Sequence, residues 1–259
     1  LVDAVETAEA TTVAMGRADA DPSEVVLRWK VSAKGETITW PAYEWTEKDS
    51  LVSGGTRIQY HPGKIREIEL EWRHAPEPEL SLPRPRGYIV SAGWPQIEEL
   101  VAGHGLVVTS LSSDTSLEVE TIRLSKPKLA SFPYQGVVMV QDFEVSRQTE
   151  LRSVPAGSLW IPADQPNFEI AVQLFEPEAP DSLVRWGVVS SVFERKIYIG
   201  FDILERLATE MLADDTVRLE WVKALEDPEF AKNRRARYLW WYQRTPFWDE
   251  TVGLLPVMR

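Results

Sequence analysis

The sequence predicts an α+β protein, with an antiparallel β-rich N-terminal part that includes a small βαβ-like unit, followed by an α-helical C-terminal part. Three observations support this class. Apolar and polar residues alternate over residues 24–73, whereas apolar residues recur at helical spacing after residue 166. The composition, 44% hydrophobic and 26% charged, is typical of a folded protein.

The first strands are predicted between Gly-containing turns. Val25, Leu27, Trp29 and Val31 alternate with more polar neighbours, and the pattern resumes after the turn at 33–36. Further short strands are expected around Ile58 and from Ile65 to Trp72. Several short strands with such turns indicate an antiparallel sheet or sandwich, in which one face can stay solvated.

Residues 75–86 contain four prolines and predict an extended, semi-rigid linker inside the β-rich domain. A strand at Gly87–Val90, a helix at Trp94–Ala102 and a strand at Leu106–Leu111 then form the βαβ-like unit. Further strands are predicted near 117–124, 137–145 and 150–154.

The chain changes from strand to helix between Val154 and Gly187. A strand at 158–161 should stop at Pro162, which has no amide to donate. Phe168, Ala171, Val172 and Phe175 lie on one helical face. Pro177 and Pro180 should end that helix, and Asp181 or Ser182 could cap a second one through Trp186 and Phe193.

Three more helices are predicted after residue 200, the last starting at the cap signal Asp227-Pro228. The tail 247–259 should pack back as extended chain. The predicted organisation is a trailing helix or linker over 1–21, a β-rich domain over 22–165, and a helical subdomain over 166–259 that packs on it.

Charge and composition exclude several classes. The 28 Lys and Arg against 40 Asp and Glu leave a net charge of −12, which argues against a general nucleic-acid binder. The basic cluster Lys232, Arg234, Arg235 and Arg237 is interpreted as a solvated helix face, with a phosphate site as the alternative.

No cysteine is present, and no apolar run approaches the ~20 residues of a membrane span. No signal peptide is visible, and the chain is expected to be an excised piece.

Several phrases resemble a known family. They are IPADQP at 161–166, LFEPEAPDSLVRWG at 174–187, RPRGYIVSAGWPQIEELVAGHGL at 84–106, PYQG at 133–136 and RRARYLWWYQRTPFWDE at 234–250. Together they resemble the region after the catalytic domain in large bacterial zinc metallocarboxypeptidases of the carboxypeptidase A-like group. The resemblance implies a C-terminal accessory region, a preceding catalytic domain that carries zinc, and a periplasmic or secreted location.

The chain itself offers no clear metal or catalytic motif. That family holds zinc with His-x-x-Glu and a distant second His, and among His61, His74 and His104 only His74 has Glu three residues later. Pro76 and Pro78 forbid a regular helix around Glu77, so we interpret His74 as a linker residue. We predict no catalytic residue, no metal site and no cofactor in this chain.

Two clusters merit a functional hypothesis. Glu176, Glu178 and Asp181 could bind a cation or an amine, but we interpret them as a helix end, a corner and a cap, with Arg185 as a basic partner for Glu176. The second cluster is aromatic, and its candidate ligand-binding residues are Trp240, Trp241, Tyr242, Arg244 and Trp248. Adjacent Trp240 and Trp241 differ by ~100° around a helix, so they should not both face one core.

Three functions follow. The first is a non-catalytic accessory region that supports or shields the catalytic domain and meets its peptide substrate. The second is an autonomous module that binds peptide or glycan through the aromatic cluster. The third is a structural or oligomer-forming domain.

Overall fold

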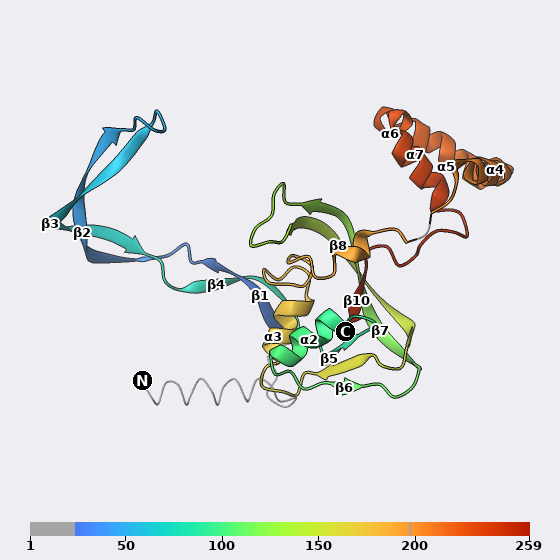
Figure 1. Cartoon of the computed structure of the whole chain (residues 1–259), viewed down its shortest axis with the longest axis horizontal. Coiled ribbons are helices and arrows are strands. Elements are labelled where there is room, and N and C mark those ends of the chain that lie inside the picture. The colour runs from blue at the N-terminus through green and yellow to red at the C-terminus, as the bar shows by residue number, and fades with distance from the viewer. Residues whose placement is uncertain (1–23, 197) are drawn as a thin grey trace. The chain divides into compact units, whose positions relative to one another are not determined.

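A computed structural model describes residues 24–196 and 198–259, and its elements confirm an α+β protein (Figure 1). The chain forms two compact units, Pro22–Arg84 and a second unit that contains Pro85–Arg259. The helix or linker predicted over 1–21 lies outside the described residues. The predicted domain limits of 22–165 and 166–259 stay a prediction.

The unit over residues 22–84 consists of two antiparallel ribbons. Strand β1 (Glu24–Val31) pairs with β4 (Pro76–Pro83), and β2 (Glu36–Asp49) pairs with β3 (Thr56–Trp72). The β2–β3 hairpin is long and twisted (Figure 1). The sequence pattern predicted two short strands where β3 is continuous, because Pro62 and Gly63 resemble a turn but lie on a strand that has a free edge.

The prediction of a linker over residues 75–86 is wrong. Most of it is strand β4, in which Pro78 lies opposite Trp29 and Pro83 lies opposite Glu24. Proline cannot donate to a ladder, but each strand of a two-stranded ribbon has one unpaired edge where a donor is not needed. The strand register also shifts on both sides of Arg28. These irregularities let the ribbon tolerate the ladder hydrogen bonds that its prolines cannot donate.

The second unit is built on a six-stranded antiparallel sheet in the order β6-β9-β5-β10-β7-β8. Its strands are β5 (Gly87–Val90), β6 (Thr109–Ser110), β7 (Thr115–Leu129), β8 (Val140–Val154), β9 (Leu159–Pro162) and β10 (Leu254–Met258). The C-terminal tail therefore supplies an inner strand. Where two strands were predicted between 137 and 154, β8 is continuous and pairs with β7 over most of its length.

The predicted βαβ-like unit is present with one addition. Strands β5 and β6 both pair antiparallel with β9, so they run parallel to each other with β9 between them. Helix α2 (Pro95–Gly103) connects them and buries Ile97 and Val101. The second strand is shorter than predicted, because only Thr109–Ser110 pairs with β9.

A buried cluster joins four strands of this sheet. Ile89, Val119, Val154 and Met258 pack together, with Trp160 against them. Helix α3 (Phe168–Phe175) buries the face that the spacing predicts, namely Phe168, Ala171, Val172 and Phe175. Its N-cap position is Asn167.

The helix predicted through Leu183, Trp186 and Phe193 is wrong. This stretch consists of turns and a short 3₁₀ helix, η1 (Ser190–Phe193). Gly187 has a φ of +70°, a conformation that no helix continues through and that glycine adopts without strain. Of the three apolar residues at helical spacing, Leu183 is buried by these turns, and Trp186 and Phe193 are half-buried.

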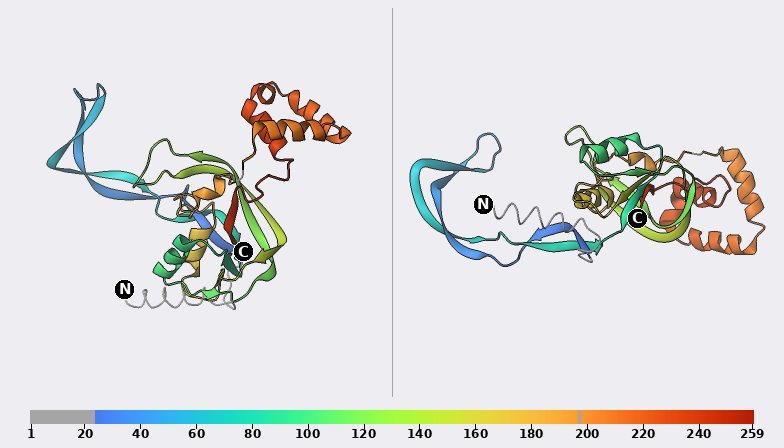
Figure 2. Two further views of the ribbon diagram at one scale, coloured as in Figure 1. Left: turned by 45° about the vertical axis from the view of Figure 1, so that its right-hand side comes forward. Right: turned by 90° about the horizontal axis from the view of Figure 1, so that it is seen from below.

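Four helices follow in succession (Figures 1 and 2). They are α4 (Phe201–Met211), α5 (Asp215–Leu225), α6 (Pro228–Lys232) and α7 (Arg234–Tyr242). Asp227 caps α6 as predicted. The last predicted helix is observed as two helices, α6 and α7, which are divided at Asn233. The Asn233 side chain accepts a hydrogen bond from the Ala236 amide and so caps the start of α7. None of the helices in the described ranges is long and apolar enough to cross a membrane.

Candidate functional sites

Glu176 is the centre of a buried ion-pair network. It is fully buried at the end of α3 and accepts hydrogen bonds from the Tyr88 hydroxyl at 2.8 Å, Arg259 Nη1 at 3.1 Å and Arg147 Nη2 at 3.1 Å. Arg147 also binds Glu178, and Arg259 also binds Glu120. With this many partners, the hydrogen-bonding capacity of the buried carboxylate is satisfied, so the network stabilises the fold.

The environment of this network shifts the pKa values of its members. Burial and the charge of Glu176 raise the pKa of Tyr88 well above its usual value. Burial alone would lower the pKa of Arg147, but its bonds to Glu178 and Glu176 raise it. Burial would also lower the pKa of Arg259, but Glu176 and Glu120 raise it. Both guanidinium groups therefore stay charged, and Tyr88 stays a hydrogen-bond donor at neutral pH.

The predicted carboxylate cluster is divided among different partners. Glu176 and Glu178 share Arg147, whereas Asp181 accepts from Trp186 Nε1 at 3.1 Å. The prediction that Arg185 is the partner of Glu176 is wrong. Arg185 instead donates to the Gln141 carbonyl and lies over the Phe143 ring. The actual partners are 29 and 83 residues away, a separation that local spacing does not reveal.

The three histidines lie at separate places and form no metal site. His74 packs against the Trp72 ring, while the Glu77 carboxylate accepts from the Ser32 hydroxyl at 2.8 Å. His61 pairs with Thr46, and His104 ends α2. Among residues 24–196 and 198–259, no group of three or more His, Cys, Asp or Glu side chains could hold a metal ion.

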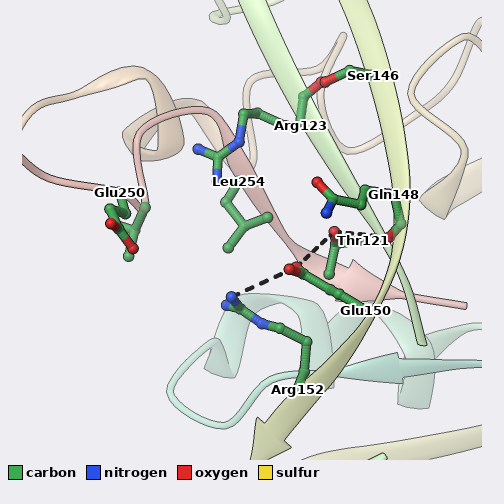
Figure 3. Close-up of a pocket in the computed structure, with 9 residues that line it drawn as sticks. Thr121, Arg123, Ser146, Gln148, Glu150, Arg152, Glu250 and Leu254 are labelled. Atoms are coloured by element: carbon green, nitrogen blue, oxygen red, sulfur yellow. Dashed lines mark hydrogen bonds and ion pairs between the residues drawn. The ribbon is translucent and has the colours of Figure 1, made fainter. Parts of the chain in front are cut away.

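A small polar pocket of about 210 Å³ lies against β7 and β8 (Figure 3). Several of its polar side chains already have partners within the chain. Glu150 accepts from the Thr121 hydroxyl at 3.0 Å and lies 3.6 Å from Arg152, and Arg123 donates to the Val252 carbonyl. The pocket is therefore a self-contained polar cluster, and we assign it no ligand.

The aromatic candidates do not form one surface. Tyr242 is fully buried and Trp241 nearly so, in a cluster that contains Leu204 and Ala208 of α4. Trp240 is half-buried beneath Arg244, whose guanidinium lies 3.5 Å from the ring centroid. Both tryptophans contact Trp221 of α5, at 4.9 and 4.8 Å between ring centroids. Trp248 packs edge-on against Tyr242.

The same helices form an open groove of about 970 Å³, which we call the α4–α7 groove. Of the predicted candidates, only Trp241 lines it. Its walls include the aromatic residues Tyr198, Phe201, Trp221 and Tyr238 and the charged residues Arg195, Arg234, Arg235, Arg237 and Glu205. The Tyr238 hydroxyl donates to the Ile199 carbonyl, which fixes α7 to the segment before α4.

Among the described residues, four arginines and one carboxylate, that of Glu205, line the groove. No carboxylate among the described residues forms an ion pair with any of the four. Arg195 lies over the rings of Tyr198 and Tyr242, and its Nη1 is buried without a hydrogen-bond partner in the described part of the chain. A buried, unpaired guanidinium nitrogen is costly, which makes a ligand acceptor favourable at this position.

The sequence identified three of these arginines only as a solvated helix face, and Lys232, Arg234, Arg235 and Arg237 are indeed exposed. Arg195 and Tyr198 were missed, because they lie in a segment without periodic pattern. The first turn of α7 carries a signal for them, because it contains two arginines and no acidic residue. The helix dipole favours acidic residues at that end, so basic residues there are unusual.

Comparison with known proteins gives a partial match. The chain is 30% identical over 115 residues to "Carboxypeptidase 2" of Trichophyton rubrum, which covers 44% of this chain and 21% of that protein. The proteins of the same name from Trichophyton tonsurans and Trichophyton equinum are also 30% identical, each over 112 residues. The chain spans about a fifth of the length of these relatives. No family model and no solved structure matches it. Part of this chain is therefore similar to part of proteins named Carboxypeptidase 2.

Proposed function

We propose that this chain is a non-catalytic C-terminal region of a carboxypeptidase-like zinc metallopeptidase, in which it supports or shields a catalytic domain. The observation that carries the proposal is its 30% identity to fungal proteins named Carboxypeptidase 2. The match covers about a fifth of those relatives, which leaves most of their length for other parts. The zinc chemistry and a periplasmic or secreted location rest on the family resemblance alone.

The β2–β3 hairpin supports an accessory role. It exposes a series of apolar side chains along both strands, including Trp40, Tyr43, Ile65 and Trp72, each of them more than half exposed. Trp40 lies opposite Ile68 and Tyr43 opposite Ile65 in the ribbon. A two-stranded ribbon has little core of its own, and exposed apolar patches of this kind mark interaction surfaces. We propose that the catalytic domain of the same polypeptide covers this hairpin.

Metal and activity measurements on the isolated chain test the non-catalytic part. The purified chain should contain no stoichiometric zinc and should release no C-terminal amino acid from peptides when zinc is added. Tightly held zinc together with peptide cleavage would reject the proposal. The reading frame before Leu1 tests the parent, because it should encode His-x-x-Glu and a distant second His.

Hairpin variants test the docking part. In a polypeptide that joins this chain to its carboxypeptidase domain, Trp40→Ser with Tyr43→Ser should lower the thermal stability of the catalytic activity. The matched control is Phe132→Ser with Tyr134→Ser, which also removes two exposed aromatic side chains, from the other unit. Equal effects from both pairs would contradict docking through the hairpin.

A second proposed function is an autonomous ligand-binding module in the helical part, favoured by the α4–α7 groove. Trp221 and Trp241 line this groove, so a bound ligand should change tryptophan fluorescence. Fluorescence titration with peptides and with glycan fragments tests it. The module is rejected if no candidate produces a saturable change.

A further inference from the structure

The α4–α7 groove combines positive charge with exposed aromatic rings. We propose that it binds an acidic peptide segment that carries aromatic or aliphatic side chains, with Arg195, Arg234 and Arg235 contacting its carboxylates. This inference rests on the second proposed function, that the helical part binds a ligand, and it assigns the chemistry of that ligand.

Charge complementarity is the first argument. Four arginines line the groove against one carboxylate, in a chain with a net charge of −12. Since acidic side chains outnumber basic ones overall, this excess of arginine is local. Arginine forms two parallel hydrogen bonds with a carboxylate or a phosphate group, so a ligand with separate anionic groups fits such a site. The overall negative charge disfavours long phosphate polymers.

The unfilled bonding capacity is the second argument. The buried Nη1 of Arg195 has no acceptor among the described residues. Arg234 and Arg235 are exposed, and the ion pairs found among the described residues do not include them. Both arginines begin α7, where the exposed amide groups and the helix dipole already favour an anion. A carboxylate placed there would interact with both arginines and with the helix terminus.

The shape and the aromatic residues favour a peptide over a small anion. The groove is open, and its volume of about 970 Å³ is at the upper end of the usual range for small-molecule sites. Tyr198 and Phe201 expose 72% and 73% of their surface beside it. Such rings would pack against apolar side chains that lie between the acidic residues of a peptide.

The test titrates the full chain with two synthetic hexapeptides, capped at both ends, and follows tryptophan fluorescence at 50 mM salt. One alternates Glu and Phe, and the other alternates Gln and Phe. The acidic peptide should bind at least tenfold more tightly, and the preference should fall at 500 mM salt. A neutral glycan fragment and an oligothymidylate serve as further probes.

Variants locate the binding. Arg234→Gln with Arg235→Gln should weaken the acidic peptide about tenfold or more, as should Arg195→Gln. Arg218→Gln is the matched control, because Arg218 lies on α5, pairs with Asp215 and does not line the groove. It should change affinity less than twofold. Circular dichroism should show that all variants remain folded, as expected for the exposed Arg234 and Arg235.

The outcomes separate the two proposals. Equal binding of the Gln peptide, tighter binding of the glycan or the oligothymidylate, or unchanged affinity in both arginine variants would overturn the acidic-peptide assignment while the binding module stands. If no probe binds at all, both proposals fall.

Discussion

The Tyr88 hydroxyl donates a 2.8 Å hydrogen bond to Glu176 Oε1, and both side chains are fully buried. This bond joins β5 to the end of α3 across 88 residues of sequence. The same carboxylate also binds Arg147 from β8 and Arg259 at the C-terminus. One buried glutamate thus connects four segments that are far apart in the chain.

Loss of the Glu176 charge should destabilise the second unit strongly. Glu176→Gln leaves two part-buried guanidinium groups without their shared, fully buried carboxylate, so the free energy of unfolding should fall by about 3 kcal/mol. Glu178→Gln is the control, since Glu178 is partly exposed and, within residues 24–196 and 198–259, binds only Arg147. Its cost should be less than half as large. Denaturant unfolding measures both, and similar costs for the two variants would refute the central role of Glu176.

The raised pKa of Tyr88 predicts that the protein loses stability at alkaline pH. Its folded-state pKa is raised, so its hydroxyl proton stabilises the folded protein below the unfolded pKa of about 10, and this contribution is lost as the pH rises further. The stability advantage of the wild type over Tyr88→Phe should therefore shrink from about pH 10 upward. Urea unfolding between pH 8 and pH 11 measures it. Tyr134→Phe, at an exposed tyrosine, should show no such trend.

Gly253 should tolerate no side chain. It has a φ of +74°, and a Cβ atom there would collide with the Leu124 carbonyl oxygen just before β10 enters the sheet. Gly253→Ala should therefore lower stability by more than the ~1–2 kcal/mol of left-handed strain alone. Gly136→Ala isolates that strain, because Gly136 has a φ of +82° and open space around it. Equal melting temperatures of the two variants would contradict the close approach.

Asn233 should determine where α7 begins. Its side chain accepts the Ala236 amide at 3.0 Å, so Asn233→Ala should cost about 1 kcal/mol and loosen the first turn that carries Arg234 and Arg235. Asn233→Asp keeps the acceptor and should match the wild type. Hydrogen exchange at the first amides of α7 measures the effect. Unchanged exchange in Asn233→Ala would show that the cap is not needed.

Patterns within a few residues of one another determined much of this protein. Alternation predicted β1 and β2, helical spacing predicted the buried face of α3, and Asp227-Pro228 marked the start of α6. These succeeded because strand and helix periods, and caps, depend on neighbours in sequence. They failed at residues 76–83 and 181–193, where strand pairing and turns outweighed proline content and apolar spacing.

Only the tertiary structure decided which distant residues meet. It chose Arg147 and Arg259 rather than nearby Arg185 as the partners of Glu176, and it inserted the C-terminal strand β10 between β5 and β7. It also placed Arg195 beside the first turn of α7 in one groove. Burial of charge and strand pairing select partners by three-dimensional fit, and no local spacing in the sequence records that fit.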